Sequence, residues 1–266
     1  MQSIYRLWIG STLMAVVLCK GSIALAQISS DGTTGTVATS TAPVEFEITG
    51  GTTSGINLFH SFNQFSVPNS GQVTFINHNP VIQNVLGRVT GPSLSNIDGL
   101  ITTAGAAPNF NLFLLNPNGI IFGPDGGLDI GGSFIASTGS GIEFNGQGIF
   151  GAVPATSTNP SLLTIAPSAL LFNQIGSVQP PSSIEVFSRF LSVPAGESLV
   201  LLGGHSAPTA TETGRVMIDG AILDAQSGRV EIGAVGGEGR VALGTDFELM
   251  FPSGVTKADI DLQGFA

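Results

Sequence analysis

Short runs of alternating apolar and polar residues recur along most of the chain, and each run ends at Gly, Asn, Pro or Ser. Clear examples are the segments QVTFIN at 72–77, NLFLLN at 111–116, SLVLLGG at 198–204 and RVEIGAV at 229–235. Each run is long enough for one β-strand and too short for a useful helix. After residue 26 no stretch repeats apolar residues at helical spacing over three turns. The pattern predicts an all-β protein.

A Gly-Arg-Val motif marks several of these runs. It occurs as GRVMID at 214–219, GRVEIG at 228–233 and GRVALG at 239–244, and GRVTG at 87–91 echoes it. The Val and the apolar residue two places later share one face of a strand, whereas the Arg points elsewhere. Spacings of 14 and 11 residues between the three copies suit one strand plus one turn. Several such units would form each coil of a β-solenoid.

A β-sandwich could also be built from short strands and regular turns. Two features favour a parallel β-helix instead. The turns are not the Asn-Gly or Asp-Gly two-residue turns of antiparallel hairpins. Some strands are nearly continuous apolar runs, such as FLL at 113–115 and LVLL at 199–202, as expected of parallel strands covered on both faces.

The first 26 residues have the pattern of a signal peptide. Arg6 precedes an apolar run at 7–19, which is shorter than a membrane span, and Ala24 and Ala26 supply the small residues that signal peptidase requires. Cleavage would leave Gln27 at the mature N-terminus. Lipid attachment at Cys19 is the alternative, but the bulky Leu18 before it disfavours this.

Composition removes several classes of function. Cys19 is the only cysteine, so the mature chain has no disulfide, thiolate nucleophile or cysteine metal site. All 18 acidic residues follow residue 26, and the formal net charge is −10, which argues against nucleic-acid binding. No later apolar run is long enough to span a bilayer. The three histidines are scattered, and no cofactor motif is present.

Two turn signals flank a very short strand in the middle of the chain. Asn116, Pro117, Asn118 and Gly119 place Asn, Pro and Gly at the positions preferred in a type I turn. A similar turn, Gly-Pro-Asp-Gly, follows at 123–126, and only three residues from Ile120 onward separate the two. This arrangement predicts a solenoid coil turning a corner.

At these residues the sequence resembles the N-terminal two-partner-secretion domain of the filamentous haemagglutinin family. The resemblance covers roughly residues 28–150 and rests on INLFHSFNQFSV at 56–67, VLGRVTGPSLSNIDGLI at 85–101 and NLFLLNPNGIIFG with LDIGGSFIAST at 111–138. It implies a right-handed parallel β-helix with a capped N-terminal end and short extra-helical strands. It also implies a two-partner-secretion domain at 27–160 and a β-helical continuation at 161–266.

The resemblance further implies a partner and a destination. Such domains direct export through the periplasm and a dedicated outer-membrane β-barrel transporter, whose periplasmic POTRA domains bind the incoming unfolded chain. The family signature corresponds here to Asn116, Pro117, Asn118, Gly119 and Ile120. The exported protein is expected to be secreted or attached to the outer cell surface as an adhesin, with host or neighbour-cell glycans as further partners. A chain of 266 residues lacks the long adhesive fibre of such proteins, so this role stays open.

A carbohydrate-active β-helix enzyme is the alternative function. Polysaccharide lyases and hydrolases on this fold need clustered carboxylates, often with a basic residue. Asp125 and Asp129 are the nearest acidic pair in the central motif, and each is explained by a turn or strand end. The only lysine after the signal peptide, Lys257, is remote in sequence. The residues therefore favour a non-enzymatic protein.

Overall fold

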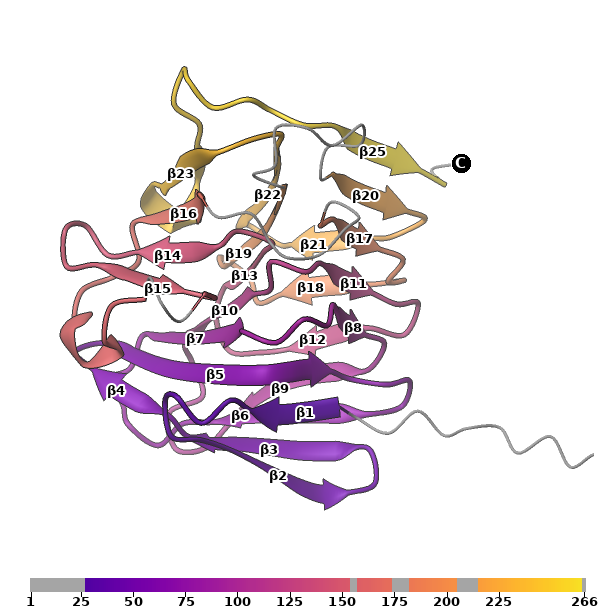
Figure 1. Cartoon of the computed structure of the whole chain (residues 1–266). Coiled ribbons are helices and arrows are strands. Elements are labelled where there is room, and N and C mark those ends of the chain that lie inside the picture. Colours follow the sequence, from indigo (N-terminus) through magenta and orange to yellow (C-terminus); the bar gives the residue numbers. More distant parts are fainter. Residues whose placement is uncertain (1–26, 154–156, 174–181, 205–214, 265–266) are drawn as a thin grey trace, which may run out of the picture.

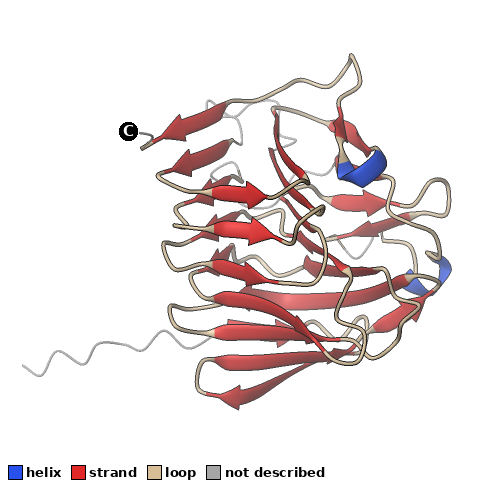
Figure 2. Ribbon diagram, turned by 180° about the vertical axis from the view of Figure 1, so that it is seen from behind, coloured by secondary structure: helices blue, strands red, loops and turns tan. Residues whose placement is uncertain are grey.

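A computed structural model describes residues 27–153, 157–173, 182–204 and 215–264. Within these ranges the chain forms a parallel β-helix of about six turns (Figure 1). The described residues contain no α-helix, only the short 3₁₀ turns η2 (Pro160–Leu162) and η3 (Thr245–Phe247), which are blue in Figure 2. No helix in the described ranges is long and apolar enough to cross a membrane.

Three sheets form the faces of the solenoid. Sheet 1 contains β1 (Gln27–Ser30), β4 (Thr52–Ser54), β5 (Asn57–Ser66), β7 (Asn84–Val89), β10 (Asn111–Leu115), β13 (Phe134–Ser137), β19 (Ser198–Gly204) and β22 (Arg229–Val235). Sheet 2 contains β8 (Ser95–Ile97), β11 (Ile120–Phe122), β17 (Ile184–Val186), β20 (Val216–Asp219) and β25 (Ile260–Gln263). Sheet 3 contains β2 (Thr36–Ala42), β3 (Glu45–Gly50), β6 (Gln72–Ile76), β9 (Leu100–Ala104) and β12 (Gly127–Asp129), and the pair β18 (Leu191–Val193) and β21 (Leu223–Ala225) continues it.

The chain visits the three sheets in a fixed order. From β7 onward it runs through sheet 1, sheet 2 and sheet 3, and then returns to sheet 1 one level further along the stack. Equivalent strands pair in parallel, so that Asn57, Asn84 and Asn111 lie in register on β5, β7 and β10, 27 residues apart. The predicted parallel β-helix is thereby confirmed.

Antiparallel strands lie at the N-terminal end and on one side of the solenoid. β1 pairs antiparallel with β5, and β2 pairs antiparallel with β3, so both cap the first coils. A side sheet, entirely antiparallel, consists of β14 (Gly141–Glu143), β15 (Ile149–Gly151), β16 (Ala169–Phe172), β23 (Gly239–Leu243) and β24 (Leu249–Met250). The predicted cap and extra-helical strands are thus both present.

Two sequence-based interpretations of local patterns were wrong. The turn between β14 and β15 contains Asn145-Gly146, with positive φ at both residues, as in hairpins of antiparallel sheets. The prediction that the turns are not Asn-Gly hairpins is therefore wrong at this position. The last Gly-Arg-Val copy also lies outside the coils, because β23 belongs to the side sheet. A strand's own sequence does not show which neighbour it will pair with.

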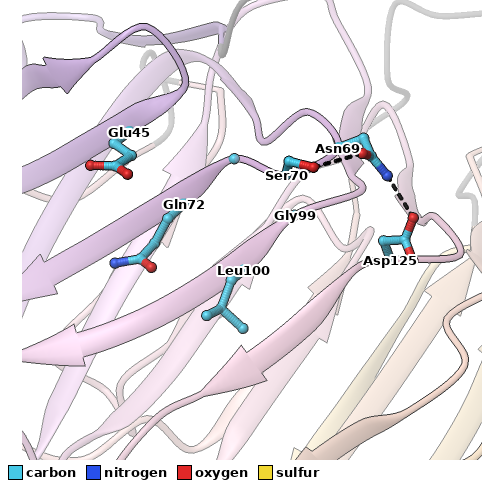
Figure 3. A pocket seen from close by; sticks show the side chains of 8 residues that line it. Glu45, Asn69, Ser70, Gln72, Gly99, Leu100 and Asp125 are labelled. Carbon is cyan, nitrogen blue, oxygen red and sulfur yellow. Dashed lines mark hydrogen bonds between the residues drawn. The ribbon is translucent and has the colours of Figure 1, made fainter.

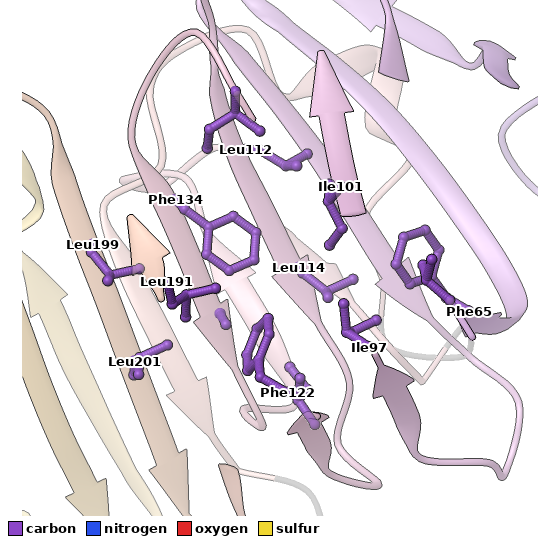
Figure 4. Close-up of a cluster of buried hydrophobic side chains, with 14 of the residues drawn as sticks. Phe65, Ile97, Ile101, Leu112, Leu114, Phe122, Phe134, Leu191, Leu199 and Leu201 are labelled. Carbon is purple, nitrogen blue, oxygen red and sulfur yellow. The ribbon is translucent and has the colours of Figure 1, made fainter. Parts of the chain in front are cut away.

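Two apolar clusters explain the continuous hydrophobic strands. On β10, Leu112 and Leu114 point into the solenoid, where Figure 4 shows them among Phe122, Phe134 and neighbouring aliphatic side chains. Phe113, between them, points outward into a second cluster beneath the side sheet. Both faces of sheet 1 are therefore buried along its central strands β7, β10, β13 and β19, as predicted from the uninterrupted apolar runs.

Candidate recognition turn

The segment Asn116–Ile120 leads from the end of β10 into the first residue of β11. As the candidate site of recognition, it is hereafter called the recognition turn. The Gly119 N–H donates to the Asn116 carbonyl oxygen (3.1 Å), closing a four-residue turn. The Asn118 N–H also donates to Oδ1 of Asn116 (3.0 Å). Gly119 has φ +114°, a value that suits glycine, and Pro117 has its φ fixed by its ring. All these constraints are local, because they join residues no more than three positions apart.

The two asparagine side chains also tie the turn to the preceding coil. Nδ2 of Asn116 donates to Oγ of Ser95 (2.9 Å) and to the carbonyl oxygen of Ser93 (3.1 Å). Nδ2 of Asn118 donates to the carbonyl oxygen of Gly91 (2.7 Å). Asparagine suits this role because one side chain both accepts from the local backbone and donates to a neighbouring coil.

The next coil covers the turn from the other side. Ser182 Oγ donates to the Pro117 carbonyl oxygen, and the Ile120 N–H donates to the carbonyl oxygen of Ser183 (3.0 Å). Asn116 and Ile120 are fully buried, with 0 % of their surface exposed. A partner protein therefore has little access to these side chains once the neighbouring coils have folded.

A second turn, at 123–126, forms the next corner of the same coil. Its Gly126 N–H donates to the Gly123 carbonyl oxygen (3.0 Å), as predicted from the sequence. The Asp125 carboxylate accepts from Asn69 Nδ2 (2.6 Å), and both side chains line a shallow exposed pocket with Glu45 and Gln72 (Figure 3). Asp125 is thus a corner residue that holds two stacked turns together.

The features required for the alternative, an enzyme, are not assembled in this pocket. Glu45 and Asp125 are its only charged lining residues, and Asp129 is not among them. Lys257 lies over the ring of Phe251, 5.3 Å from the centroid, beside the last coil. In the described part of the chain no group of three or more His, Cys, Asp or Glu side chains could hold a metal ion.

Arg88 has a structural role that could not be predicted from the sequence pattern. Only 3 % of its surface is exposed, and its guanidinium donates to Ser61 Oγ (2.8 Å), Thr33 Oγ1 (3.0 Å) and the Gly151 carbonyl oxygen (2.5 Å). It also lies 4.4 Å from the ring centroid of Phe150. One side chain therefore joins the N-terminal cap, sheet 1 and the side sheet.

Asp31 partly balances the charge of this buried arginine. Burial raises the pKa of the Asp31 carboxyl, but hydrogen bonds from Ser61, Thr33 and Thr90 outweigh it, so the pKa lies below its usual value. Burial lowers the pKa of Arg88, and the nearby Asp31 opposes that effect. Both groups are charged at neutral pH, and each depends on the polar network between cap and coil.

Residues far along the chain complete the first coil. Nδ2 of Asn57, whose side chain is fully buried, donates to the carbonyl oxygens of Leu163 (2.9 Å) and Ile165 (2.6 Å). Ser54 Oγ donates to the carbonyl oxygen of Ser161 (2.8 Å). Buried polar groups without partners cost about 1–3 kcal/mol each. The first coil therefore reaches full stability only when the segment up to 165 has docked.

His60 is a buried neutral imidazole within the same N-terminal region. Its Nδ1 lies 3.2 Å from Thr36 Oγ1, and its ring stacks on Phe62 and meets Phe75 edge-on. Burial lowers the pKa of His60 from its usual 6.5 to about 4. His60 therefore serves in packing and hydrogen bonding within the first coils.

The depressed pKa of His60 predicts a loss of stability in mild acid. Above pH 6.5 the imidazole is neutral in both states, and this group adds no pH dependence. As the pH falls from 6.5 to about 4, the unfolded chain takes up a proton that the folded chain resists. The free energy of unfolding should drop by about 3 kcal/mol over this window.

Urea unfolding at a series of pH values would measure this slope. In His60→Phe, which keeps an aromatic ring between Phe62 and Phe75, the slope should be largely removed. His78→Gln, at an exposed histidine, is the control and should keep the slope of the parent protein. An unchanged slope in His60→Phe would show that another group is responsible.

Known proteins include secretion domains that are similar to this chain. No curated protein sequence matches the chain. The solved HMW1 secretion domain from Haemophilus influenzae is similar in fold, with a TM-score of 0.51 at 16% identity over 88% of this chain and 50% of that one. The filamentous hemagglutinin secretion domain gives a TM-score of 0.45 at 15% identity, covering 88% and 73% respectively.

The chain thus spans only half the length of the HMW1 domain structure. The sequence identifies the family directly. The model of one protein family, described as the TPS secretion domain, matches residues 26–264. That match includes the recognition turn, the cap and all the described coils. The chain belongs to the TPS secretion domain family.

Proposed function

We propose that this chain is the recognition part of a two-partner-secretion exoprotein, bound in the periplasm by the POTRA domains of a dedicated outer-membrane transporter before it folds. The observation that carries the proposal is the contrast within the recognition turn. Its internal hydrogen bonds join neighbouring residues and need no tertiary structure. Two of its side chains, Asn116 and Ile120, are nevertheless fully buried once adjacent coils are in place, and Pro117 and Asn118 are half-buried. Such a turn is available to a partner mainly in the unfolded chain.

Folding outside the cell then makes export directional. The first coil lacks its buried hydrogen-bond partners until residues 161–165 arrive. Premature folding in the periplasm is disfavoured while the transporter holds the recognition turn, because that turn links two neighbouring coils. Release would allow the coils to stack from the capped end. A division into a recognition unit at 27–160 and a continuation at 161–266 belongs to this proposal.

A non-enzymatic role follows from the same proposal. The family is one of secretion domains, and the described pocket has two carboxylates without a neighbouring base. Attachment to the cell surface and binding of glycans are further parts of the proposed adhesin role. Loss of release into the medium when the transporter gene is deleted, with the chain degraded in the periplasm, is the expected result. Undiminished release from the deletion strain would contradict the proposal.

Processing at Gln27 is a separate prediction. The cleavage residues Ala24 and Ala26 lie outside the described residues, whereas Gln27 is the first residue of β1. Exported protein should therefore begin at Gln27 when its N-terminus is sequenced, and an Ala26→Phe variant should accumulate uncleaved. Recovery of protein that begins at a lipid-modified Cys19 would contradict this prediction.

A further inference from the structure

The chain contains two Asn-Gly pairs, Asn118-Gly119 and Asn145-Gly146, and both can in principle undergo the same spontaneous reaction. The glycine backbone nitrogen attacks the Asn side-chain carbonyl carbon, and ammonia leaves as a cyclic succinimide forms. Water then opens the ring to aspartate or isoaspartate. Glycine favours the attack because no Cβ obstructs it and its backbone is permissive. The fold exposes the pair at 145–146 and shields the pair at 118–119.

Asn145-Gly146 is open to the reaction in the folded protein. Both residues are exposed at the tip of the hairpin between β14 and β15, which projects from the side of the solenoid (Figure 1). The Asn145 side chain and the Gly146 N–H have no hydrogen-bond partner among the described residues. No atom lies within 4 Å of the position that a Cβ on Gly146 would occupy. Neither reacting group is restrained.

Asn118-Gly119 is shielded by the fold. The attacking nitrogen is engaged, since the Gly119 N–H donates to the Asn116 carbonyl oxygen (3.1 Å). The Asn118 amide is engaged too, since its Nδ2 donates to the Gly91 carbonyl oxygen (2.7 Å) and to Asn116 Oδ1 (3.0 Å). Gly119 itself is buried. Reaction there requires at least local unfolding of the turn.

Conversion at the two positions would have opposite consequences. An aspartate at 118 has no N–H donor, so its carboxylate would face the acceptor oxygens of Gly91 and Asn116. Repulsion between these oxygens opposes closure of the corner between coils. An aspartate at 145 would lie in solvent and displace nothing. The same chemistry therefore damages the fold at one site and leaves it intact at the other.

We propose that Asn118 is a deamidation site of the unfolded chain, that Asn145 is one of the folded protein, and that conversion at 118 alone prevents folding. A chain kept unfolded for too long would thereby lose its ability to fold, while a folded chain would be protected at this position. The inference rests on the hydrogen bonds of the turn and does not depend on recognition by a transporter.

The first test compares the mature protein in mildly alkaline buffer with the same protein held in urea. Peptide mass spectrometry over time should show conversion at 145 in both samples and at 118 only in urea. In the folded sample the rate at 118 should be lower by more than about tenfold, because it scales with the open fraction of the turn. Equal rates at 118 with and without urea would overturn the inference, as would no conversion at 145 in the folded protein.

The second test separates chemistry from folding. After a long incubation in urea and refolding, the folded fraction should contain chains converted at 145 and be depleted of chains converted at 118. Asn118→Asp should give a strongly reduced folded yield, and the matched variant Asn145→Asp should refold like the parent. Gly146→Ala should slow conversion at 145 in a folded chain, since the added Cβ hinders the attack. Normal refolding of Asn118→Asp would refute the proposed block.

Discussion

Export of an Asn116→Ala, Asn118→Ala double variant through its own transporter should fall by at least about tenfold, since a loss of 1.4 kcal/mol in binding already has that effect. The two asparagines supply the side-chain hydrogen bonds that form the recognition turn and link it to the preceding coil. Their loss should also lower the stability of the folded protein by about 2–4 kcal/mol. The exported fraction, measured by immunoblot of medium and periplasm, reports the first effect.

A matched control separates recognition from stability. Asn84 is a buried asparagine of β7, and its side chain donates to Asn57 Oδ1 (3.0 Å) and accepts from Asn111 Nδ2 (3.1 Å). Asn84→Ala should cost a similar amount of folding stability, about 1–3 kcal/mol, without touching the turn. It should therefore be exported normally and melt earlier after release. Equal export defects in the two variants would leave only a structural role for the turn.

Replacing Arg88 by methionine is expected to have the largest effect on folding stability, about 3–5 kcal/mol. The change leaves the oxygens of Ser61, Thr33 and Gly151 without their common donor, and Ser61 and Gly151 are buried. Because these oxygens belong to the cap, the coil and the side sheet, all three regions should become more open to proteases. Urea unfolding and limited proteolysis of the purified protein would measure both effects.

Arg240 provides the comparison for Arg88. It forms an ion pair with Glu143 on the surface of the side sheet, where 45% of the Arg240 side chain is exposed. Arg240→Met should cost less than about 1 kcal/mol, because exposed pairs of this kind contribute little. A cost for Arg88→Met that is no greater than this would contradict the assignment of a joining role to Arg88.

The recognition turn could be predicted from the sequence because its determinants are local. Asn116, Pro117 and Gly119 each act through their own backbone or through residues two or three positions away. The short strand that follows was also predicted, since two turn signals enclose it. Its neighbours in space could not be predicted, because Ser95 and Ser183 belong to other coils.

Arg88 shows why other features were missed. In the Gly-Arg-Val pattern its side chain points away from the solenoid core, which alone indicates an exposed residue. The hairpin at 141–151 covers that outer face and buries it, and the acceptor at Gly151 lies 63 residues further along the chain. Asn57 is similar, since its acceptors are more than 100 residues away. Strand periodicity identifies a face but not the segment that covers it.

The most direct test of the central claim is binding of the transporter's purified periplasmic domains to this chain in its unfolded and folded states. The unfolded chain, presented immediately after dilution from urea, should bind. The folded chain should bind more weakly by at least about tenfold, because Asn116 and Ile120 are then fully buried. In the unfolded state, Asn84→Ala should bind like the parent chain, and the Asn116→Ala, Asn118→Ala variant should lose most of its affinity. Equal binding of the folded and unfolded chains, or unchanged binding of that double variant, would contradict recognition of this turn before folding.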